Sequence, residues 1–210
     1  MYRLYYSPGA ASLVVHWLLL ELGVDHETQR LDLTAGEQKR PEYLALNPNG
    51  VVPTLLIDGK PFSEAAALLL QLADRHPEAG LAPPLGSEQR AAYYQWMLFL
   101  ANTLQPVFRS WWYPHEAAGE ANVEAVKEKA REKIEAIWSR IDAHLDVKGP
   151  WLLGEQLSAA DFMLTMLMRW SRNMPKPATE WPQLAAMAAR MKARPSFAEL
   201  YAREGLTEWA

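Results

Sequence analysis

The 210-residue sequence contains no cysteine. This absence excludes disulfide bonds, cysteine-based metal sites and a nucleophilic thiol supplied by the protein itself. It also fits a reducing compartment, so we expect a cytoplasmic location. The sequence has no metal-like spacing of His, Asp and Glu residues and no phosphate-binding loop, and we therefore expect no bound metal.

Long hydrophobic runs are also missing. No window approaches the roughly 18 apolar residues that a membrane span requires. The apolar stretch from Leu13 to Leu20 is short and contains His16, which is not typical of a signal peptide. The formal net charge of −4 gives no general affinity for nucleic acid or for acidic membranes. We expect neither of them as a partner.

The first third of the chain predicts a small α/β domain. Strands are expected at residues 2–6, 26–33, 54–57 and around 61–62, and helices at 13–20 and 63–75. Asp58-Gly59 is a strong two-residue hairpin signal between the last two strands. The helix between the first two strands predicts a crossover, which makes those strands parallel.

The rest of the chain predicts an all-helical domain. Proline and glycine concentrate in the segment before Ser87, as they do in linkers, and a long helix is expected from Ser87 until Pro106 kinks or ends it. A second long helix is indicated by apolar residues spaced by three or four positions: Val123, Val126, Ala130, Ile134, Ile137, Ile141 and Leu145. Further helices are expected from Ser158 and over 182–194. The predicted domains are 1–77 and 87–210, joined by a linker at 78–86.

The turn from Tyr6 to Ser12 lies between the first strand and the first helix. It carries three hydroxyl side chains, those of Tyr6, Ser7 and Ser12. A helix N-terminus stabilises anions, thiolates included, because its first N–H groups lack partners. We therefore expect this turn to form part of a ligand site.

Pro53 opens the third predicted strand. Proline cannot donate to a sheet, so a strand start is its natural position. If the Val52–Pro53 bond is cis, the backbone N–H and C=O of Val52 could pair with an extended peptide ligand, as an added strand would. The alternative is an ordinary trans proline that opens an edge strand.

Two further segments resemble helix starts. In Ser63-Glu64-Ala65, free N–H groups could bind a carboxylate and Glu64 could hold a ligand ammonium; the alternative is a helix cap without a ligand. Ser158-Ala159-Ala160-Asp161 is a capping-box pattern with Asp in the place of Glu or Gln, and a folding role is expected for it.

Taken in order, these four segments resemble the glutathione transferase superfamily, and most of all its bacterial beta class. The resemblance covers essentially the whole chain. It implies a thioredoxin-like N-terminal domain, an all-helical C-terminal domain and a homodimer. It also implies that Pro53 is cis, that the backbone of Val52 pairs with the cysteinyl unit of glutathione, and that Glu64 and the backbone of Ala65 hold the γ-glutamyl end.

The sequence departs from the beta class at three positions. Ala11 stands where the class carries a cysteine, and Gln105 where it tends to place a histidine. Ala65 replaces the serine of a common Glu-Ser pair, so one hydroxyl contact is lost. Mixed-disulfide chemistry by the protein itself is excluded.

A hydroxyl group can still activate the glutathione thiol. A free thiol has a pKa of about 8.5, and lowering it by two units requires roughly 2.7 kcal/mol. A hydrogen bond to the anion supplies about 1.5–3 kcal/mol, and a helix N-terminus adds about 0.3–1 kcal/mol. Ser12 is the first choice of donor, Tyr6 the second and Ser7 the third. The alternatives are that Ser12 bonds only the backbone and that Tyr6 is a packed strand residue.

The second substrate is expected to be a hydrophobic electrophile, because Phe108, Trp111 and Trp112 gather at the end of the first long helix. Packing between helices or domains is the alternative reading for these aromatic residues. The leading hypothesis is a transferase that conjugates the glutathione thiolate to such electrophiles, as in detoxification. Two others are kept: a glutathione-dependent peroxidase or disulfide reductase, and a non-catalytic glutathione-binding or interaction protein.

Overall fold

A computed structural model describes residues 1–209, apart from the side chains at positions 118 and 120. Its contacts divide the chain into two compact units, which are Met1–Ala82 with Lys192–Ala210, and Pro83–Met191. The contacts group the last helix with the N-terminal unit, whereas the sequence placed it in the helical domain expected at 87–210. No described helix is long and apolar enough to cross a membrane.

A four-stranded sheet forms the centre of the first unit. Its strands are β1 (Tyr2–Tyr6), β2 (His26–Arg30), β3 (Thr54–Ile57) and β4 (Lys60–Ser63), in the order β2-β1-β3-β4. β1 and β2 are parallel, as predicted, whereas β1–β3 and β3–β4 are antiparallel. The second strand is shorter than expected, although Leu31 and Leu33 still pack in one apolar cluster. The expected thioredoxin-like fold of this unit is confirmed.

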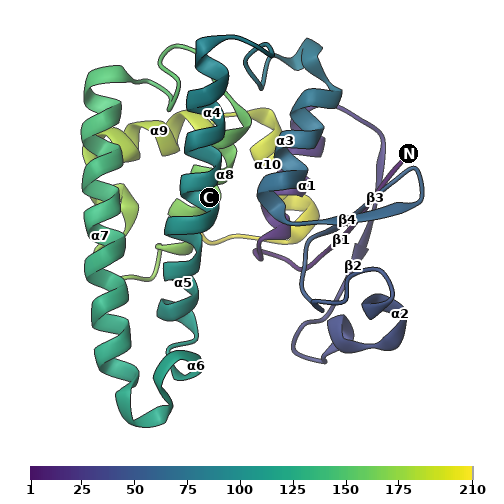
Figure 1. Cartoon of the computed structure of the whole chain (residues 1–210), viewed down its shortest axis with the longest axis horizontal. Helices are drawn as coiled ribbons and strands as arrows, with labels where there is room; N and C mark the ends of the chain where they lie inside the picture. The colour runs from purple at the N-terminus through teal and green to yellow at the C-terminus, as the bar shows by residue number, and fades with distance from the viewer. Residues whose placement is uncertain (210) are drawn as a thin grey trace. The chain divides into compact units, whose positions relative to one another are not determined.

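Three helices of this unit pack together: α1 (Ser12–Glu21), α3 (Ala65–Arg75) and α10 (Pro195–Glu204) (Figure 1). The short helix α2 (Pro41–Leu44) brings Tyr43 to within 5.6 Å of Tyr5, measured between ring centroids. Alternation along β1 directs Tyr5 to the face opposite Leu4 and Tyr6. Helix α10 was not predicted from the sequence. It begins at Pro195, and proline is favoured at the first position of a helix.

The second unit is helical, as expected. Its main helices are α4 (Glu88–Phe99), α5 (Gln105–Trp112), α7 (Val123–Lys148), α8 (Ala159–Trp170) and α9 (Pro182–Lys192), with the short α6 (His115–Ala118) between α5 and α7. A π-helical turn, Leu100–Leu104, joins α4 to α5. Pro106 lies just after this turn, and a proline lacks the N–H that an unbroken helix needs. The long helix is therefore interrupted near Pro106, as predicted, by a change from π-helical to α-helical hydrogen bonding.

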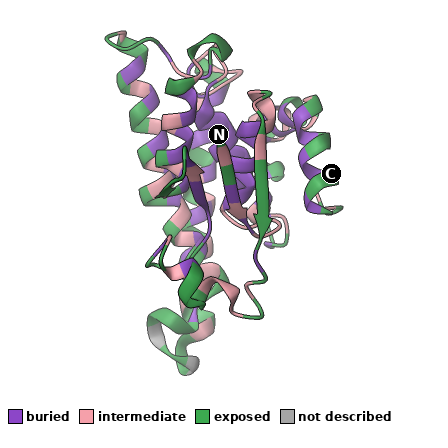
Figure 2. Cartoon of the chain, turned by 90° about the vertical axis from the view of Figure 1, so that its right-hand side faces the viewer, coloured by how far each residue is buried: buried purple, intermediate pink, exposed green. Residues whose placement is uncertain are grey.

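The buried stripe of α7 differs from the predicted one at three of its seven positions and includes Trp138, which was not predicted. Ala130, Ile134, Trp138, Ile141 and Leu145 are buried, whereas Val123, Val126 and Ile137 are only half-buried. Trp138, the residue after Ile137, is fully buried. Buried positions recur between exposed ones along the helices, as amphipathic helices require (Figure 2).

The capping segment of α8 is fully buried. The Asp161 carboxylate accepts hydrogen bonds from the Leu152 N–H at 2.9 Å, the Ser158 N–H at 2.8 Å and the Ser158 hydroxyl at 2.9 Å. The predicted capping box is confirmed, with Asp in the Glu position. Burial raises the pKa of Asp161 to about 6, although these hydrogen bonds act to lower it.

This raised pKa predicts a pH-dependent stability. The folded chain holds the Asp161 proton more tightly than the unfolded chain, whose carboxyl has a pKa near 3.8. The stabilisation is complete below about pH 4 and is lost as the pH rises through 6. Between pH 4 and pH 7, the wild type should lose about 2–3 kcal/mol relative to Asp161→Asn. Urea unfolding of both proteins at the two pH values measures this, and an unchanged difference would contradict it.

Candidate functional site

Three segments that the sequence singled out leave the sheet at one end. Tyr5 pairs with Thr54 in the register of β1 and β3, and Thr54 pairs with Ser63 in that of β3 and β4. The turn after β1, the residues before β3 and the start of α3 after β4 therefore meet at the same edge. The fold of the first unit brings together the three segments on which the ligand-site prediction rests.

Ser12 is fully buried at the start of α1. Its hydroxyl donates to the Ser7 carbonyl at 3.2 Å and accepts from the Ser7 N–H at 3.1 Å. Its only proton is already used, and no surface is left for a ligand. These bonds match the alternative in which Ser12 bonds only the backbone of the turn.

Ser7 is the hydroxyl that remains available in the turn. Its side chain is half-buried, and within the described chain its oxygen has no hydrogen-bond partner. The backbone N–H groups of Ala11 and Ser12 likewise find no acceptor among residues 1–209. One hydroxyl and two N–H groups therefore surround the start of α1, and this combination suits an anion.

The Tyr6 side chain lies on the face of the sheet that α1 covers. Its ring lies 5.3 Å from the His16 ring, between centroids, and the residue is only 8% exposed. Burial raises the pKa of Tyr6, and the nearby Glu204 carboxylate raises it further. A less acidic phenol is a weaker hydrogen-bond donor, so the structure favours Tyr6 less than the sequence did.

Glu204, at the end of α10, is hydrogen-bonded to the turn between β1 and α1. Its buried carboxylate accepts from the Gly9 N–H at 2.9 Å and lies 2.9 Å from Nδ1 of His16, which is itself buried. Sequence reasoning missed Glu204 because it lies 195 residues from Gly9 and no local pattern marks it. His16 is therefore buried and paired inside the first unit.

The segment before β3 presents an unpaired backbone. The Val52–Pro53 peptide bond is cis, as the resemblance implied. Within the described chain, neither the N–H nor the C=O of Val52 makes a hydrogen bond. The preceding carbonyl, that of Val51, accepts from the Tyr43 hydroxyl at 2.6 Å and from Asn47 Nδ2 at 2.8 Å. These two side chains fix the segment, and neither was recognised from the sequence.

Lys39 lies beside this segment. Its Nζ donates to the Asn49 carbonyl at 3.2 Å, and a Cβ at Gly50 would come within 2.7 Å of that Nζ. Gly50 also has a φ of +59°, which glycine adopts without cost. The described chain gives Lys39 no carboxylate partner, so its ammonium is available to a ligand.

Glu64 has an unusual backbone. Its φ of 71° and ψ of 106° are rare for a residue other than glycine, and strain of this kind is retained mainly at functional sites. Its exposed carboxylate has no partner among the described residues. The next residue, Ala65, begins α3 with an N–H that has no acceptor in that part of the chain. The position therefore offers a carboxylate beside free N–H donors.

The aromatic residues of α5 lie in the second unit and separate into two groups. Phe108 is fully buried, with its ring 6.1 Å from Trp138 and 6.0 Å from Trp170, between centroids. This burial matches the alternative reading, in which Phe108 packs between helices. Trp112 is 41% exposed, and Trp111 is half-buried with Lys127 Nζ 5.6 Å from its ring centroid.

No group of three or more His, Asp or Glu side chains within residues 1–209 is placed to hold a metal ion. The protein groups that the site presents are the ones from which we derive its chemistry. These are the Ser7 hydroxyl, the N–H groups at two helix starts, the Val52 backbone and the Glu64 carboxylate.

Two family models match the chain. Residues 10–75 match "Glutathione S-transferase, N-terminal domain", and residues 101–204 match "Glutathione S-transferase, C-terminal domain". Glutathione S-transferase GST-4.5 of Xanthomonas campestris is 33% identical, with 97% of this chain and 99% of the relative covered. The disulfide-bond oxidoreductase YfcG of Escherichia coli is 28% identical, with 93% and 92% covered.

Solved structures agree with these relatives. A beta-class glutathione S-transferase from Sphingomonas chungbukensis superposes with a TM-score of 0.85 at 28% identity, covering 98% of this chain and all of that one. A sphingomonad glutathione S-transferase complexed with glutathione gives 0.85 at 30% identity, with the same coverage. The resemblance read from the four segments is confirmed: the chain belongs to the glutathione S-transferase family, and a bacterial beta-class enzyme is among the structures that it resembles.

Proposed function

We propose that the protein conjugates the glutathione thiolate to hydrophobic electrophiles. The observation that carries the proposal is the meeting of three unpaired features at one end of the sheet, which are the α1 turn, the Val52 backbone and the Glu64 carboxylate. A tripeptide with a thiol, an amide backbone and a free ammonium needs these partners. Saturable conjugation of a chloronitrobenzene-type substrate tests the proposal, and no turnover across a panel of electrophiles would refute it.

Glutathione is proposed to bind along this edge as an added strand. The N–H and C=O of Val52 pair with the cysteinyl unit, next to Pro53. Glu64 accepts from the γ-glutamyl ammonium, and the N–H of Ala65 donates to its carboxylate. Because Ala65 has no hydroxyl, that carboxylate relies on backbone donors alone. The free ammonium of Lys39 suits the glycyl carboxylate.

The thiolate is proposed to lie at the start of α1. The Ser7 hydroxyl and the N–H groups of Ala11 and Ser12 donate to the sulfur, in the place that a cysteine would occupy in the beta class. A hydrogen bond to the anion contributes about 1.5–3 kcal/mol, and the helix end about 0.3–1 kcal/mol. Together they supply the roughly 2.7 kcal/mol that lowers a thiol pKa by two units. Ser12 acts indirectly, by positioning Ser7.

Replacing Ser7 and Ser12 with alanine, one at a time, separates these roles. Ser7→Ala should lower kcat/KM for the conjugation about 10- to 100-fold, because one donor to the thiolate is lost, and should leave stability within about 0.5 kcal/mol. Ser12→Ala should instead destabilise the fold by about 1–3 kcal/mol, because the Ser7 N–H loses its acceptor in a buried turn. Tyr6→Phe should change the rate less than Ser7→Ala does. An unchanged rate in Ser7→Ala would remove Ser7 from the mechanism.

The electrophile is proposed to contact Trp112, whose exposed ring provides a flat apolar surface, together with Trp111. Phe108 has no part in this proposal. A substitution of Trp112 by alanine should therefore raise KM for the aromatic electrophile and leave the affinity for glutathione unchanged.

A second candidate function is glutathione-dependent reduction of disulfides or peroxides. The similarity to a relative named a disulfide-bond oxidoreductase favours it. Both thiols would come from glutathione: two molecules are oxidised to glutathione disulfide while the substrate disulfide is reduced to two thiols. The absence of cysteine is therefore no obstacle. Consumption of glutathione that depends on a disulfide substrate and proceeds without conjugation would decide for this alternative.

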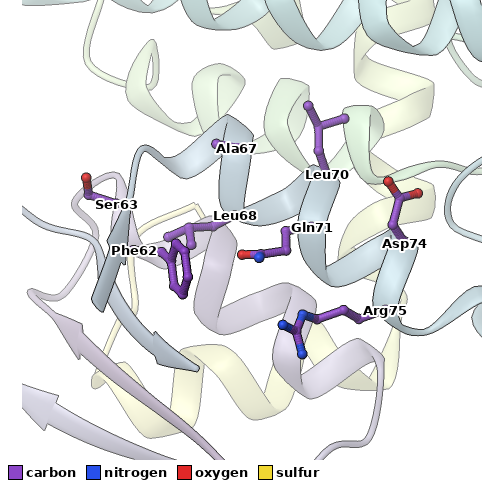
Figure 3. Close-up of a pocket in the computed structure, with 8 residues that line it drawn as sticks. All are labelled: Phe62, Ser63, Ala67, Leu68, Leu70, Gln71, Asp74 and Arg75. Carbon is purple, nitrogen blue, oxygen red and sulfur yellow. The ribbon is translucent and has the colours of Figure 1, made fainter. Parts of the chain in front are cut away.

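We also propose a cytoplasmic homodimer. Support for self-association comes from a shallow pocket of about 530 Å³ on the free edge of the sheet, lined by β4 and α3 (Figure 3). Phe62 lines it and is 39% exposed, and Gln71 and Arg75 add polar groups to the lining. Sedimentation of the wild type and of Phe62→Glu tests this. A monomeric wild type would refute it.

A further inference from the structure

The turn that leads to Val52 contains an asparagine followed by a glycine. Asn49 is the only asparagine in the sequence with glycine after it, and it is exposed. In such a pair, the backbone nitrogen of the glycine can attack the side-chain amide, because glycine has no Cβ to obstruct the approach. Asn47 is buried and is followed by Pro48, whose nitrogen carries no hydrogen. Asn47 therefore cannot undergo the same reaction.

Lys39 is placed to promote this attack at Asn49. Its Nζ donates to the Asn49 backbone carbonyl at 3.2 Å, and this carbonyl belongs to the amide that contains the Gly50 nitrogen. When that nitrogen loses its proton, the negative charge is shared with the carbonyl oxygen. An ammonium group at hydrogen-bond distance favours the charged form. No carboxylate of the described chain pairs with Lys39, so its charge is not offset.

The turn itself restrains the reaction. Gly50 is buried, and its N–H donates to the Asn47 carbonyl at 2.9 Å, while the Asn49 N–H donates to Asn47 Oδ1 at 3.2 Å. The bond from Gly50 has to open before its nitrogen can be deprotonated. Surface turns open locally at a free energy below that of global unfolding. The reaction is therefore slow compared with catalysis, and it proceeds while the protein stays folded.

We propose that Asn49 is a deamidation site, and that its conversion inactivates the segment that binds glutathione. The Gly50 nitrogen loses its proton to hydroxide and bonds to Cγ of Asn49. The bond from Cγ to Nδ2 breaks, and the departing nitrogen takes a proton from water and leaves as ammonia. Water then opens the succinimide ring. Opening at Cγ gives aspartate, and opening at the backbone carbonyl carbon gives isoaspartate, whose main chain runs through the former side chain.

Either product places a carboxylate beside Lys39. The effect on binding rests on the proposed function: the new carboxylate competes with the glycyl carboxylate of glutathione for the Lys39 ammonium. Isoaspartate has a further effect, because it adds a carbon to the main chain just before Val52. The hydrogen bond between Gly50 and Asn47 then no longer fits the turn, and the Val52 backbone loses its fixed position. Converted protein should therefore bind glutathione more weakly.

The reaction is measured by peptide mapping of the full-length protein after incubation at neutral pH without glutathione. Mapping also separates it from isomerisation at Asp58, which precedes a glycine as well. Asn49 of the wild type should convert to aspartate and isoaspartate. Lys39→Gln should slow the conversion about fivefold or more, because the anion loses a charge-assisted hydrogen bond. Arg40→Gln is the matched control: Arg40 pairs with Glu37 at 3.1 Å, so its loss should leave the rate within about twofold.

Glutathione affinity connects the modification to function. Converted wild-type protein, separated by ion exchange, should bind glutathione about tenfold or more weakly than fresh protein. Asn49→Gln should keep its initial affinity through the same incubation, since attack on the longer side chain is slower.

Three results would each overturn the proposal: Asn49 unchanged after prolonged incubation, equal conversion rates in the wild type and Lys39→Gln, and undiminished glutathione affinity in converted protein. Fresh wild-type protein that binds no glutathione would instead refute the proposed function. Peptide mapping does not depend on glutathione binding, so the two failures are distinguishable.

Discussion

Replacing Glu204 with alanine should lower the free energy of unfolding by about 3–5 kcal/mol, a large part of the 5–15 kcal/mol typical of a folded protein. The carboxylate is buried and serves two donors, the Gly9 N–H and the His16 ring. Its removal takes this acceptor away from both donors in a buried region, where water does not readily replace it. Urea unfolding measures the loss.

The same substitution should weaken glutathione binding, since the turn that presents Ser7 loses its anchor at Gly9. Glu204→Gln keeps one acceptor oxygen and should show about half of the loss in stability. Glu199→Ala, on the same helix, removes only an exposed ion pair with Arg203 and should cost less than about 0.5 kcal/mol. If Glu204→Ala were as mild as Glu199→Ala, the carboxylate would not be holding the turn.

Glu64→Gln should raise the Kd for glutathione about tenfold or more, because a charge-assisted hydrogen bond to the γ-glutamyl ammonium becomes a neutral one. The carboxylate is exposed and has no partner in the described chain, so the substitution should leave stability nearly unchanged. Equilibrium dialysis or calorimetry gives the affinity. An unchanged Kd would show that the ammonium binds elsewhere.

An analogue of glutathione without the amino group provides the matched control. Glutaryl-cysteinylglycine should bind the wild type about as weakly as glutathione binds Glu64→Gln, and the two changes together should add little further loss. Glu64→Gly should bind glutathione poorly and yet be more stable by about 1 kcal/mol, because glycine adopts a φ of 71° without strain. Weak binding combined with higher stability would show that the strain at Glu64 is kept for function.

Local sequence signals predicted most elements of the fold. The Asp58-Gly59 hairpin, the parallel pair formed by the first two strands and the capping box at Ser158 each depend on residues close together in the chain, and each is present. The roles proposed for Val52 and Glu64 came from the family resemblance, because the local sequence left an ordinary strand start and an ordinary helix cap open.

The features that the sequence could not predict depend on distant residues. Whether Ser12 is free or bonded depends on the conformation of the turn at Ser7, and that turn is fixed partly by Glu204 at the far end of the chain. The rings of Phe108 and Trp138 pack together in the core of the second unit. The spacing of apolar residues does not show which large side chains such a core accommodates. Hydrophobic spacing therefore predicted that Ile137 is buried. The same spacing could not show that Phe108 is buried in the core.

The most direct test of the proposed thiolate site is an ultraviolet titration of bound glutathione. The thiolate absorbance is followed against pH at saturating glutathione, with S-methylglutathione as the reference that removes the tyrosine signal of the protein. If the turn from Tyr6 to Ser12 holds the sulfur, the bound thiol should titrate about two units below the 8.5 of the free thiol, and Ser7→Ala should reverse much of that shift. Glutathione that binds tightly while its thiol titrates as it does in water would contradict the mechanism.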